Sequence, residues 1–404
     1  MRKQLFILVG MIMLSSLTLK AQVEDTSFVI LPDSSNFITA SMIISSPGNA
    51  IYAQVGHVAL RMECPRYHLD FCFSFEEEHG TIGVLKCFFG KTYARIIAMP
   101  TDQFIERFKI KGRQTMQYTL NLNLREKQEL WRRLDNDLVD ETVRHFNLLQ
   151  NNCLLVACQS VKAAMEKEKI IINDWPEQFK MNNGEIIKYY TRSAPWLQFL
   201  CNTFIGTEGD VLRGYEERMG PELLPQVLRA ALIVDEQGNK RPLLTEEKEL
   251  SPLIKKFKAS PASPMWVFGA LLIITIIISF AQLKWKLKWL PKALDVLFMV
   301  FVTLMGMIFI YTSFVSGLFG KHWNWYLIPC NPLPLIIWLI WRKRKWFYKV
   351  YLFYTVVLLL FIIATPLTQQ LDLPHQLITA SLAVRCCCHY VQGRIQNQSM
   401  KQEE

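Results

Sequence analysis

Apolar and polar side chains alternate along several short segments in the first half of the chain, with the period of two that is typical of β-strands. The alternation is clearest over residues 52–62 and 69–75, which Cys64 and Pro65 separate. These two segments predict a hairpin that places His57 and the polar side chains of the second strand on one surface. Weaker alternation predicts further strands at residues 83–89, 94–99 and 116–122.

Helical spacing predicts two helices after these strands. Asn123 followed by Glu126 has the pattern of a capping box, and leucines recur at helical spacing behind it. A second helix is predicted from Cys153, because Asn152 is a favourable N-cap residue and apolar residues recur at helical spacing behind it. Residues 175–260 are predicted to be mainly helical and looped. Strands flanked by helices indicate an α+β domain.

From residue 265 onward, long apolar runs replace the mixed pattern. A proline-interrupted run at 326–341 is short, and the run at 373–390 contains Arg385. The pattern predicts an all-α membrane domain over residues 265–392 with about five transmembrane helices, followed by a tail over residues 393–404. Three other runs are each long enough to cross a bilayer: residues 265–283, 294–317 and 348–367.

The net charge of +10 is not spread evenly over the chain. Residues 22–264 carry 29 basic and 31 acidic side chains, whereas residues 265–404 carry 13 basic and 4 acidic ones. The basic excess lies in the first and third loops between the predicted spans, which places these loops in the cytoplasm and the preceding domain in the periplasm. We therefore predict a multi-pass protein of the inner (cytoplasmic) membrane, and no pattern indicates nucleic-acid binding.

The start of the chain has the pattern of an export signal. Arg2 and Lys3 precede an apolar run over residues 5–19, which ends at small and polar residues. This order predicts a secretory signal peptide over residues 1–21, with an uncleaved anchor helix as the alternative. Both interpretations make the domain over residues 22–264 an exported one.

Cys153 is the first candidate for chemistry, because a cysteine in the first turn of a helix is stabilised as the thiolate by the helix dipole. His57 is the candidate base, although spacing alone does not show that the two side chains meet. Export permits disulfides, and Cys64 and Cys72 flank the predicted hairpin turn. The sequence has no CxxC pair, HExxH motif, GxSxG motif or phosphate loop, and it therefore predicts no metal and no cofactor.

Several motifs, taken in their order along the chain, resemble one family of exported domains. They are Gly56-His57-Val58-Ala59-Leu60-Arg61, Leu69-Asp70 with Phe73-Ser74-Phe75, Phe88-Phe89-Gly90-Lys91, and Asn152-Cys153. Together they resemble the Lnb N-terminal periplasmic domain, a family name that implies an exported domain but no particular reaction. Later segments also resemble this family: Ala194-Pro195-Trp196, Gly206 with Asp210, Met219 with Leu224-Pro225, and the run from Asn324 to Pro332.

A histidine on an early strand followed by a later Asn-Cys pair also resembles the permuted papain-like proteins, in a looser way. This resemblance implies a permuted papain-like domain in which Cys153 is the nucleophile and His57 the general base. It also implies a third polar residue that orients the imidazole, for which Asp70 is the first choice and Ser74 and His68 are alternatives. The backbone N–H of Cys153 is the implied donor to an oxyanion.

The matching motifs also supply the expected substrate contacts, Asn152, Arg61 and Lys91. The chain departs from the related pattern at one point. Relatives often have a polar Thr-Arg pair after Asn-Cys, whereas residues 154–156 are apolar here.

Two functions from different classes fit these expectations. The first is a membrane-anchored periplasmic cysteine hydrolase or acyltransferase that acts on an amide or ester of an envelope component, namely peptidoglycan, lipid or an exported protein. The second is a non-catalytic envelope factor with the same fold that binds or matures such a component. A hydrolase needs His57 and Cys153 within hydrogen-bond reach of each other in an open cleft.

Overall fold

The computed structural model describes residues 37–50, 53–77, 83, 86, 89–146, 151–165, 167–173, 175–212, 220–254, 262–316, 322–367 and 371–403. The predicted signal peptide lies outside these described residues.

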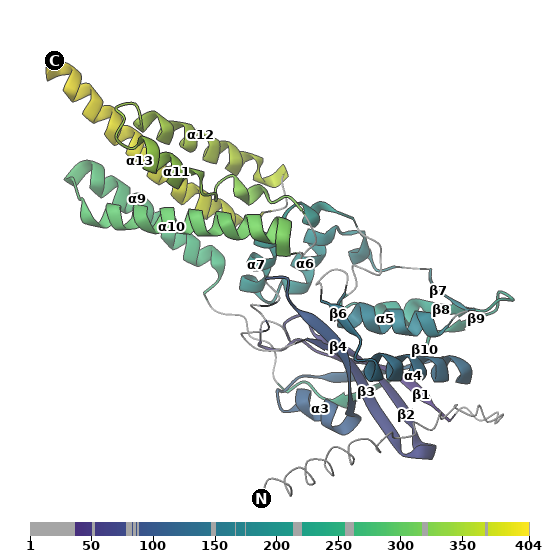
Figure 1. Cartoon of the computed structure of the whole chain (residues 1–404). Helices are drawn as coiled ribbons and strands as arrows, with labels where there is room; N and C mark the ends of the chain where they lie inside the picture. The colour runs from purple at the N-terminus through teal and green to yellow at the C-terminus, as the bar shows by residue number, and fades with distance from the viewer. Residues whose placement is uncertain are drawn as a thin grey trace, which may run out of the picture. The chain divides into compact units, whose positions relative to one another are not determined.

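A seven-stranded antiparallel sheet forms the centre of the part of the chain that precedes the apolar helices (Figure 1). Its strand order is β10-β5-β1-β2-β3-β4-β6. The strands are β1 (Thr39–Ser45), β2 (His57–Cys64), β3 (Leu69–Glu77), β4 (Tyr93–Pro100), β5 (Thr115–Leu120), β6 (Val143–His145) and β10 (Leu244–Ser251).

The predicted hairpin is confirmed as β2 and β3, which are joined by the short 3-10 turn Pro65–Tyr67. Its register places Ala59 opposite Ser74 and Arg61 opposite Cys72. Cys64 and Cys72 project to opposite faces of the sheet and both are free thiols, so no disulfide closes the hairpin.

The two faces of the sheet are covered by different helices. On one face, α4 (Leu124–Val139) and α5 (Cys153–Ala164) pack side by side against the sheet (Figure 1). The capping box between Asn123 and Glu126 is confirmed at the start of α4. On the other face, α3 (Thr101–Lys109) packs on the sheet through a smaller apolar cluster. That cluster consists of Ile43, Ala59, Cys72, Phe104 and Phe108.

Several strands depart from the expectations. β1 was not predicted because its surroundings are polar, yet it pairs with both β2 and β5 inside the sheet. The strand expected at residues 83–89 is wrong where the structure describes it, since Gly83 and Lys86 are helical. Alternation over so few residues does not separate a strand from one helical turn.

The region 175–260 also contains strands, which corrects the expectation of helices and loops alone. In this region β8 (Ala231–Val234) and β9 (Lys240–Pro242) join β7 (Lys169–Ile172), which lies just before it, in a small antiparallel sheet. β10 lies at the edge of the large sheet, and most of its side chains are exposed. Polar edge strands lack the apolar alternation that marks a half-buried strand.

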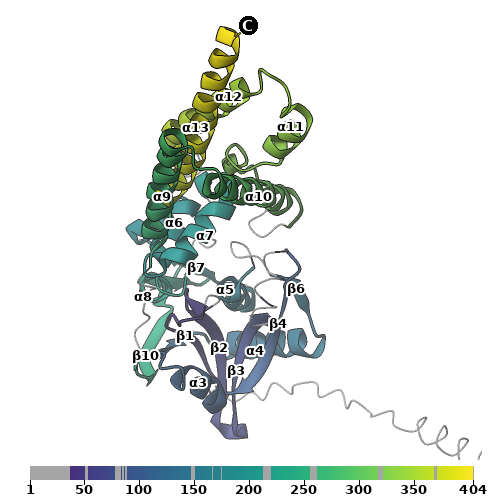
Figure 2. The same ribbon diagram turned by 90° about the vertical axis from the view of Figure 1, so that its left-hand side faces the viewer.

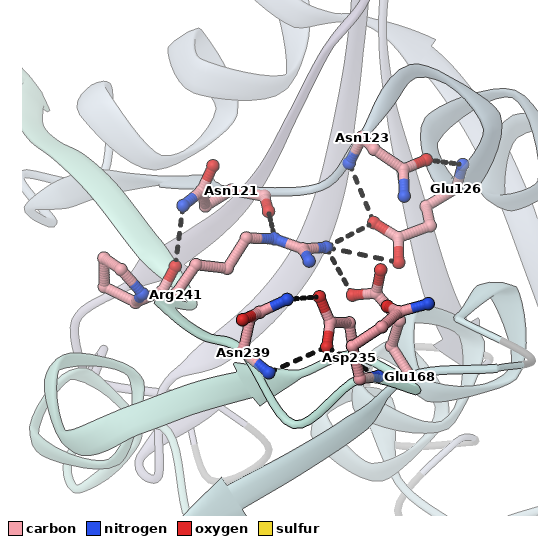
Figure 3. A network of polar contacts seen from close by, with 9 residues as sticks. Asn121, Asn123, Glu126, Glu168, Asp235, Asn239 and Arg241 are labelled. Carbon is pink, nitrogen blue, oxygen red and sulfur yellow. Dashed lines mark hydrogen bonds and ion pairs between the residues drawn. The ribbon is translucent and has the colours of Figure 1, made fainter.

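An ionic network ties the small sheet to the main domain (Figure 3). Arg241 on β9 donates to both carboxylate oxygens of Glu126 on α4, at 3.0 and 3.3 Å, and pairs with Glu168 before β7. Burial raises the pKa of the Glu126 carboxyl. Since Glu126 also caps α4, one carboxylate joins the helix start to the second sheet.

Short helices follow the second sheet's first strand and precede the apolar part of the chain. They are the 3-10 helix η3 (Glu177–Lys180), α6 (Asn183–Thr191), α7 (Pro195–Ile205), the 3-10 helix η4 (Gly206–Asp210) and α8 (Leu224–Ala230).

Helices joined by short loops and turns make up the apolar part in the residues that the structure describes. Two of its helical stretches are long and apolar enough to cross a membrane, Pro264–Trp285 and Trp289–Ser316, the second of which ends in a π-helical turn. α13 packs against both α9 and α12 (Figure 2). The predicted number of five spans stays a prediction. The elements are α9 (Pro264–Trp285), α10 (Trp289–Tyr311), η7 (Trp325–Leu327), α11 (Leu333–Trp341), α12 (Tyr348–Ala364), η8 (Thr365–Leu367) and α13 (Leu373–Glu403).

Candidate functional site

Cys153 is the first residue of α5, as the sequence predicts. Asn152 caps this helix, because its side-chain oxygen accepts a hydrogen bond of 3.0 Å from the backbone N–H of Leu155. The Cys153 side chain is partly exposed. A thiolate at this position faces the positive end of the helix dipole, which stabilises the charged form.

The Cys153 side chain lines a small cavity between α5 and the sheet. Apolar residues such as Val58, Phe75 and Ala157 form most of the wall, and Ser160 also lines it. The cavity measures about 10 Å³, which is room for about one water molecule. The apolar residues 154–156 that follow the cysteine are buried in the core, which accounts for their departure from the polar pair of relatives.

His57 begins β2 and lies on the face of the sheet that α3 covers. Its Nε2 atom is 2.7 Å from the Ser74 hydroxyl, and its ring stacks on Phe108 with the centroids 5.9 Å apart. Val58, the next residue, projects to the other face and lines the cavity of Cys153. His57 and Cys153 therefore lie at the same end of the sheet but on opposite faces of it.

Asp70 binds Arg61 rather than the imidazole. Both carboxylate oxygens accept hydrogen bonds from the Arg61 guanidinium, at 2.8 and 2.7 Å, and the Thr101 hydroxyl donates to Asp70 at 2.6 Å. Burial alone would raise the pKa of Asp70, but the hydrogen bonds from Arg61 and Thr101 lower it overall. Of the three candidates for orienting His57, the structure brings Ser74 to the ring.

The predicted substrate contacts are not gathered at one place. Arg61 is occupied by Asp70 and by Gln117, whose side-chain oxygen accepts a hydrogen bond of 2.6 Å. Asn152 acts as a helix cap. Lys91 is exposed on the loop before β4. Within the described residues, no group of three or more His, Cys, Asp or Glu side chains is arranged to hold a metal ion.

Other motif residues lie at a joint between the first part of the chain and the apolar helices, which spacing did not reveal. Gly90 has a positive φ of 63°, and a Cβ atom there would lie 1.6 Å from the carbonyl oxygen of Ser316, which ends the π-helical turn after α10. Beside it, the Tyr311 hydroxyl donates to the Phe89 carbonyl at 3.1 Å. Only glycine permits this approach, so the joint explains the glycine of the Phe-Phe-Gly-Lys motif.

A second contact at this joint involves Gly206, the first residue of η4. The next backbone N–H, of Thr207, donates to the Trp323 carbonyl at 2.8 Å, and the Asn324 side chain donates to the Thr203 carbonyl at 2.8 Å. A Cβ atom on Gly206 would lie 2.4 Å from that same Trp323 oxygen. These later motif segments therefore hold the two parts of the chain together.

Comparison with known families agrees with this two-part organisation. Residues 33–175 match the family model of the Lnb N-terminal periplasmic domain, and residues 256–396 match that of the Lnb transmembrane domain. The chain therefore carries an Lnb N-terminal periplasmic domain followed by an Lnb transmembrane domain. No curated protein and no solved structure matches the chain significantly.

These two domain matches make this chain a membrane-anchored protein with a periplasmic domain. The periplasmic domain has the predicted mixed α+β architecture. The permuted papain-like arrangement and the cysteine chemistry stay predictions.

Proposed function

We propose that this chain is a cysteine hydrolase or acyltransferase, anchored in the inner membrane by several spans, that acts on an amide or ester of an envelope component. The observation that carries the proposal is the position of Cys153. Its thiol lies at the capped start of α5, where the positive end of the helix dipole favours a thiolate and an oxyanion. Peptidoglycan, a lipid or an exported protein would supply the scissile group.

The proposed chemistry has two steps. The Cys153 sulfur attacks the carbonyl carbon, a C–S bond forms, and the C–N or C–O bond breaks as the leaving group takes up a proton. Water or an acceptor amine or alcohol then attacks the thioester, which releases the thiol and the acyl product. His57 is the proposed carrier of the proton, and Ser74 is the residue proposed to orient it.

The start of β2 must rearrange for His57 to serve Cys153 directly. A shift of one residue in a strand transfers every side chain to the other face, and His57 is the first residue of β2. Gly56 precedes it with φ of 94°, so the chain enters the strand through a residue that tolerates more than one backbone conformation. The cavity must open as well, since its present volume does not admit an acyl group.

The second candidate is a non-catalytic envelope binding or maturation factor. The placement of His57 and Cys153 on opposite faces favours this candidate. So does the small size of the cavity. In this function, Cys153 is a packing residue of α5, and the His57–Ser74 contact stabilises the sheet under α3.

Labelling with a thiol-reactive probe across pH separates the two candidates. The full-length protein in detergent is compared with Cys153→Ala, His57→Ala and, as a matched control on the same helix, Cys158→Ala. For the enzyme we expect a fast phase at neutral pH that disappears in the first two variants and persists in the third. Slow labelling of Cys153 that His57→Ala leaves unchanged would reject the enzyme in favour of the binding factor.

A further inference from the structure

Two basic loops that are far apart in the sequence meet at one end of the bundle of apolar helices. The first loop joins α9 to α10, and the second joins α11 to α12. The C-terminal half of α13 links them, because the Gln282 side chain on α9 donates to Gln392 on α13 at 2.8 Å. The adjacent Gly393 packs so closely on Tyr348, at the start of α12, that an added Cβ would lie 2.4 Å from the tyrosine Cβ.

The basic side chains of both loops are exposed at this end. Asp295 is engaged inside the bundle, where Arg385 donates to both of its carboxylate oxygens and His389 lies 2.8 Å from one of them. We call the nine exposed residues the basic end: Lys284, Lys286, Lys288, Lys292, Arg342, Lys343, Arg344, Lys345 and Lys349.

Aromatic rings accompany these charges. Trp285 and Trp289 flank the first loop and are 68% and 77% exposed. Trp346 in the second loop is also exposed. Tryptophan prefers the level of the lipid headgroups, and clustered Lys and Arg beside a membrane helix attract anionic headgroups. The apolar outer surfaces of α9 and α12 begin next to the basic end. When these surfaces lie in the acyl chains of a bilayer, the basic end lies at the level of the lipid headgroups.

From this juxtaposition we infer that the basic end is a binding surface for acidic phospholipids. The phosphate and additional negative charge of phosphatidylglycerol-type headgroups complement the nine cations, while the tryptophans pack among the upper acyl carbons. This interaction does not depend on the proposed chemistry of Cys153.

The test uses the full-length chain reconstituted into phosphatidylcholine vesicles that contain trace spin-labelled phosphatidylglycerol or spin-labelled phosphatidylcholine. We expect the protein to associate with the acidic lipid about fivefold more strongly than with the neutral one at low salt. The preference should fall toward unity as the salt concentration approaches about 0.5 M, because the headgroup contacts are screened.

A sixfold variant, with Lys284, Lys286, Lys288, Lys343, Arg344 and Lys345 all changed to Gln, should lose most of this preference. The matched control changes three exposed lysines of the periplasmic domain, Lys111, Lys240 and Lys248, to Gln and should keep it. Equal association of the two lipids with the wild type, or a preference that the sixfold variant retains, would overturn the inference. The salt titration of the wild type tests it even if the variant fails to fold.

Discussion

The two faces of the large sheet are stabilised by different kinds of contact. The face under α4 and α5 is a continuous apolar core, into which the strands contribute residues such as Val58, Leu60 and Phe73. The face under α3 has a small apolar cluster beside charged and polar motif residues, which hold one another through hydrogen bonds. The candidate nucleophile belongs to the first face and the candidate base to the second, so different layers of the fold determine their positions.

A comparison of two cysteines shows what this difference means for reactivity. Cys72 is fully buried under α3, with its sulfur 3.5 Å from the Thr101 hydroxyl, and burial raises the pKa of its thiol to about 12. Cys153 is partly exposed at a helix start. A buried thiol with a raised pKa is inert at neutral pH, whereas a thiol at a helix start is suited to react. The positions of Cys72 and Cys153 in the fold therefore give them different thiol reactivities, although both lie in or near the family motifs.

The largest effect is expected from a cavity in the apolar face. Leu130 on α4 is fully buried, and Leu130→Ala should lower the free energy of unfolding of the periplasmic domain by about 2–5 kcal/mol. Hydrogen exchange of the β2 and β3 amides in the full-length protein measures this loss. Leu212→Ala, at an exposed leucine, is the control and should change stability by less than about 0.5 kcal/mol. Equal losses in both variants would show that the α4/α5 face is not the main core.

An intermediate effect is expected from the ion pair on the other face. Asp70→Asn removes the charge that Arg61 and Thr101 bind, and should cost about 1–3 kcal/mol at neutral pH. Glu129→Gln is the control, because Glu129 binds the exposed Arg132 and should cost at most about 1 kcal/mol. Denaturant unfolding of the full-length protein in detergent gives both values.

The pH dependence of the Asp70 effect has a definite sign. The pKa of Asp70 is lowered in the folded protein, so its contribution is complete above the unfolded pKa, about 3.9, and is lost as pH falls through the folded pKa. The stability difference between wild type and Asp70→Asn should thus be constant near neutrality and shrink in acid. A difference that grows in acid would contradict the assignment of the Arg61–Asp70 pair.

The smallest effect is expected from the hydroxyl beside His57. Ser74→Ala removes the 2.7 Å contact with the imidazole and should cost about 1 kcal/mol. Ser45→Ala, on a buried serine whose hydroxyl is 3.4 Å from Thr115, is the matched control with a weaker bond. If His57 serves Cys153, Ser74→Ala should also slow thiol labelling of Cys153 several-fold, whereas Ser45→Ala should not. Unchanged labelling in both would limit Ser74 to a structural role.

Sequence patterns predicted those elements whose signals are local. They are the β2–β3 hairpin, the capping box at Asn123 and the helix that starts at Cys153. Each of these depends on residues that are close together in the sequence. β1 and β10 escaped prediction because neighbouring strands stabilise them, and their own side chains include buried serines or exposed charges. At the candidate site, the sequence indicated Cys153, His57 and the choice among Asp70, Ser74 and His68, but not which residue meets which.

The sequence by itself determined that this chain has an exported-type α+β region followed by a basic-flanked apolar region, and that Cys153 begins a helix. The period of hydrophobic residues, helix caps and charge clusters each involve residues that are near one another in the sequence. They can therefore be recognised without knowledge of the tertiary structure. Tertiary structure alone decided that Asp70 binds Arg61, that Ser74 binds His57, and that the glycine motifs join the two regions. These outcomes depend on which strands become neighbours and which face each side chain takes, and non-local pairing decides both.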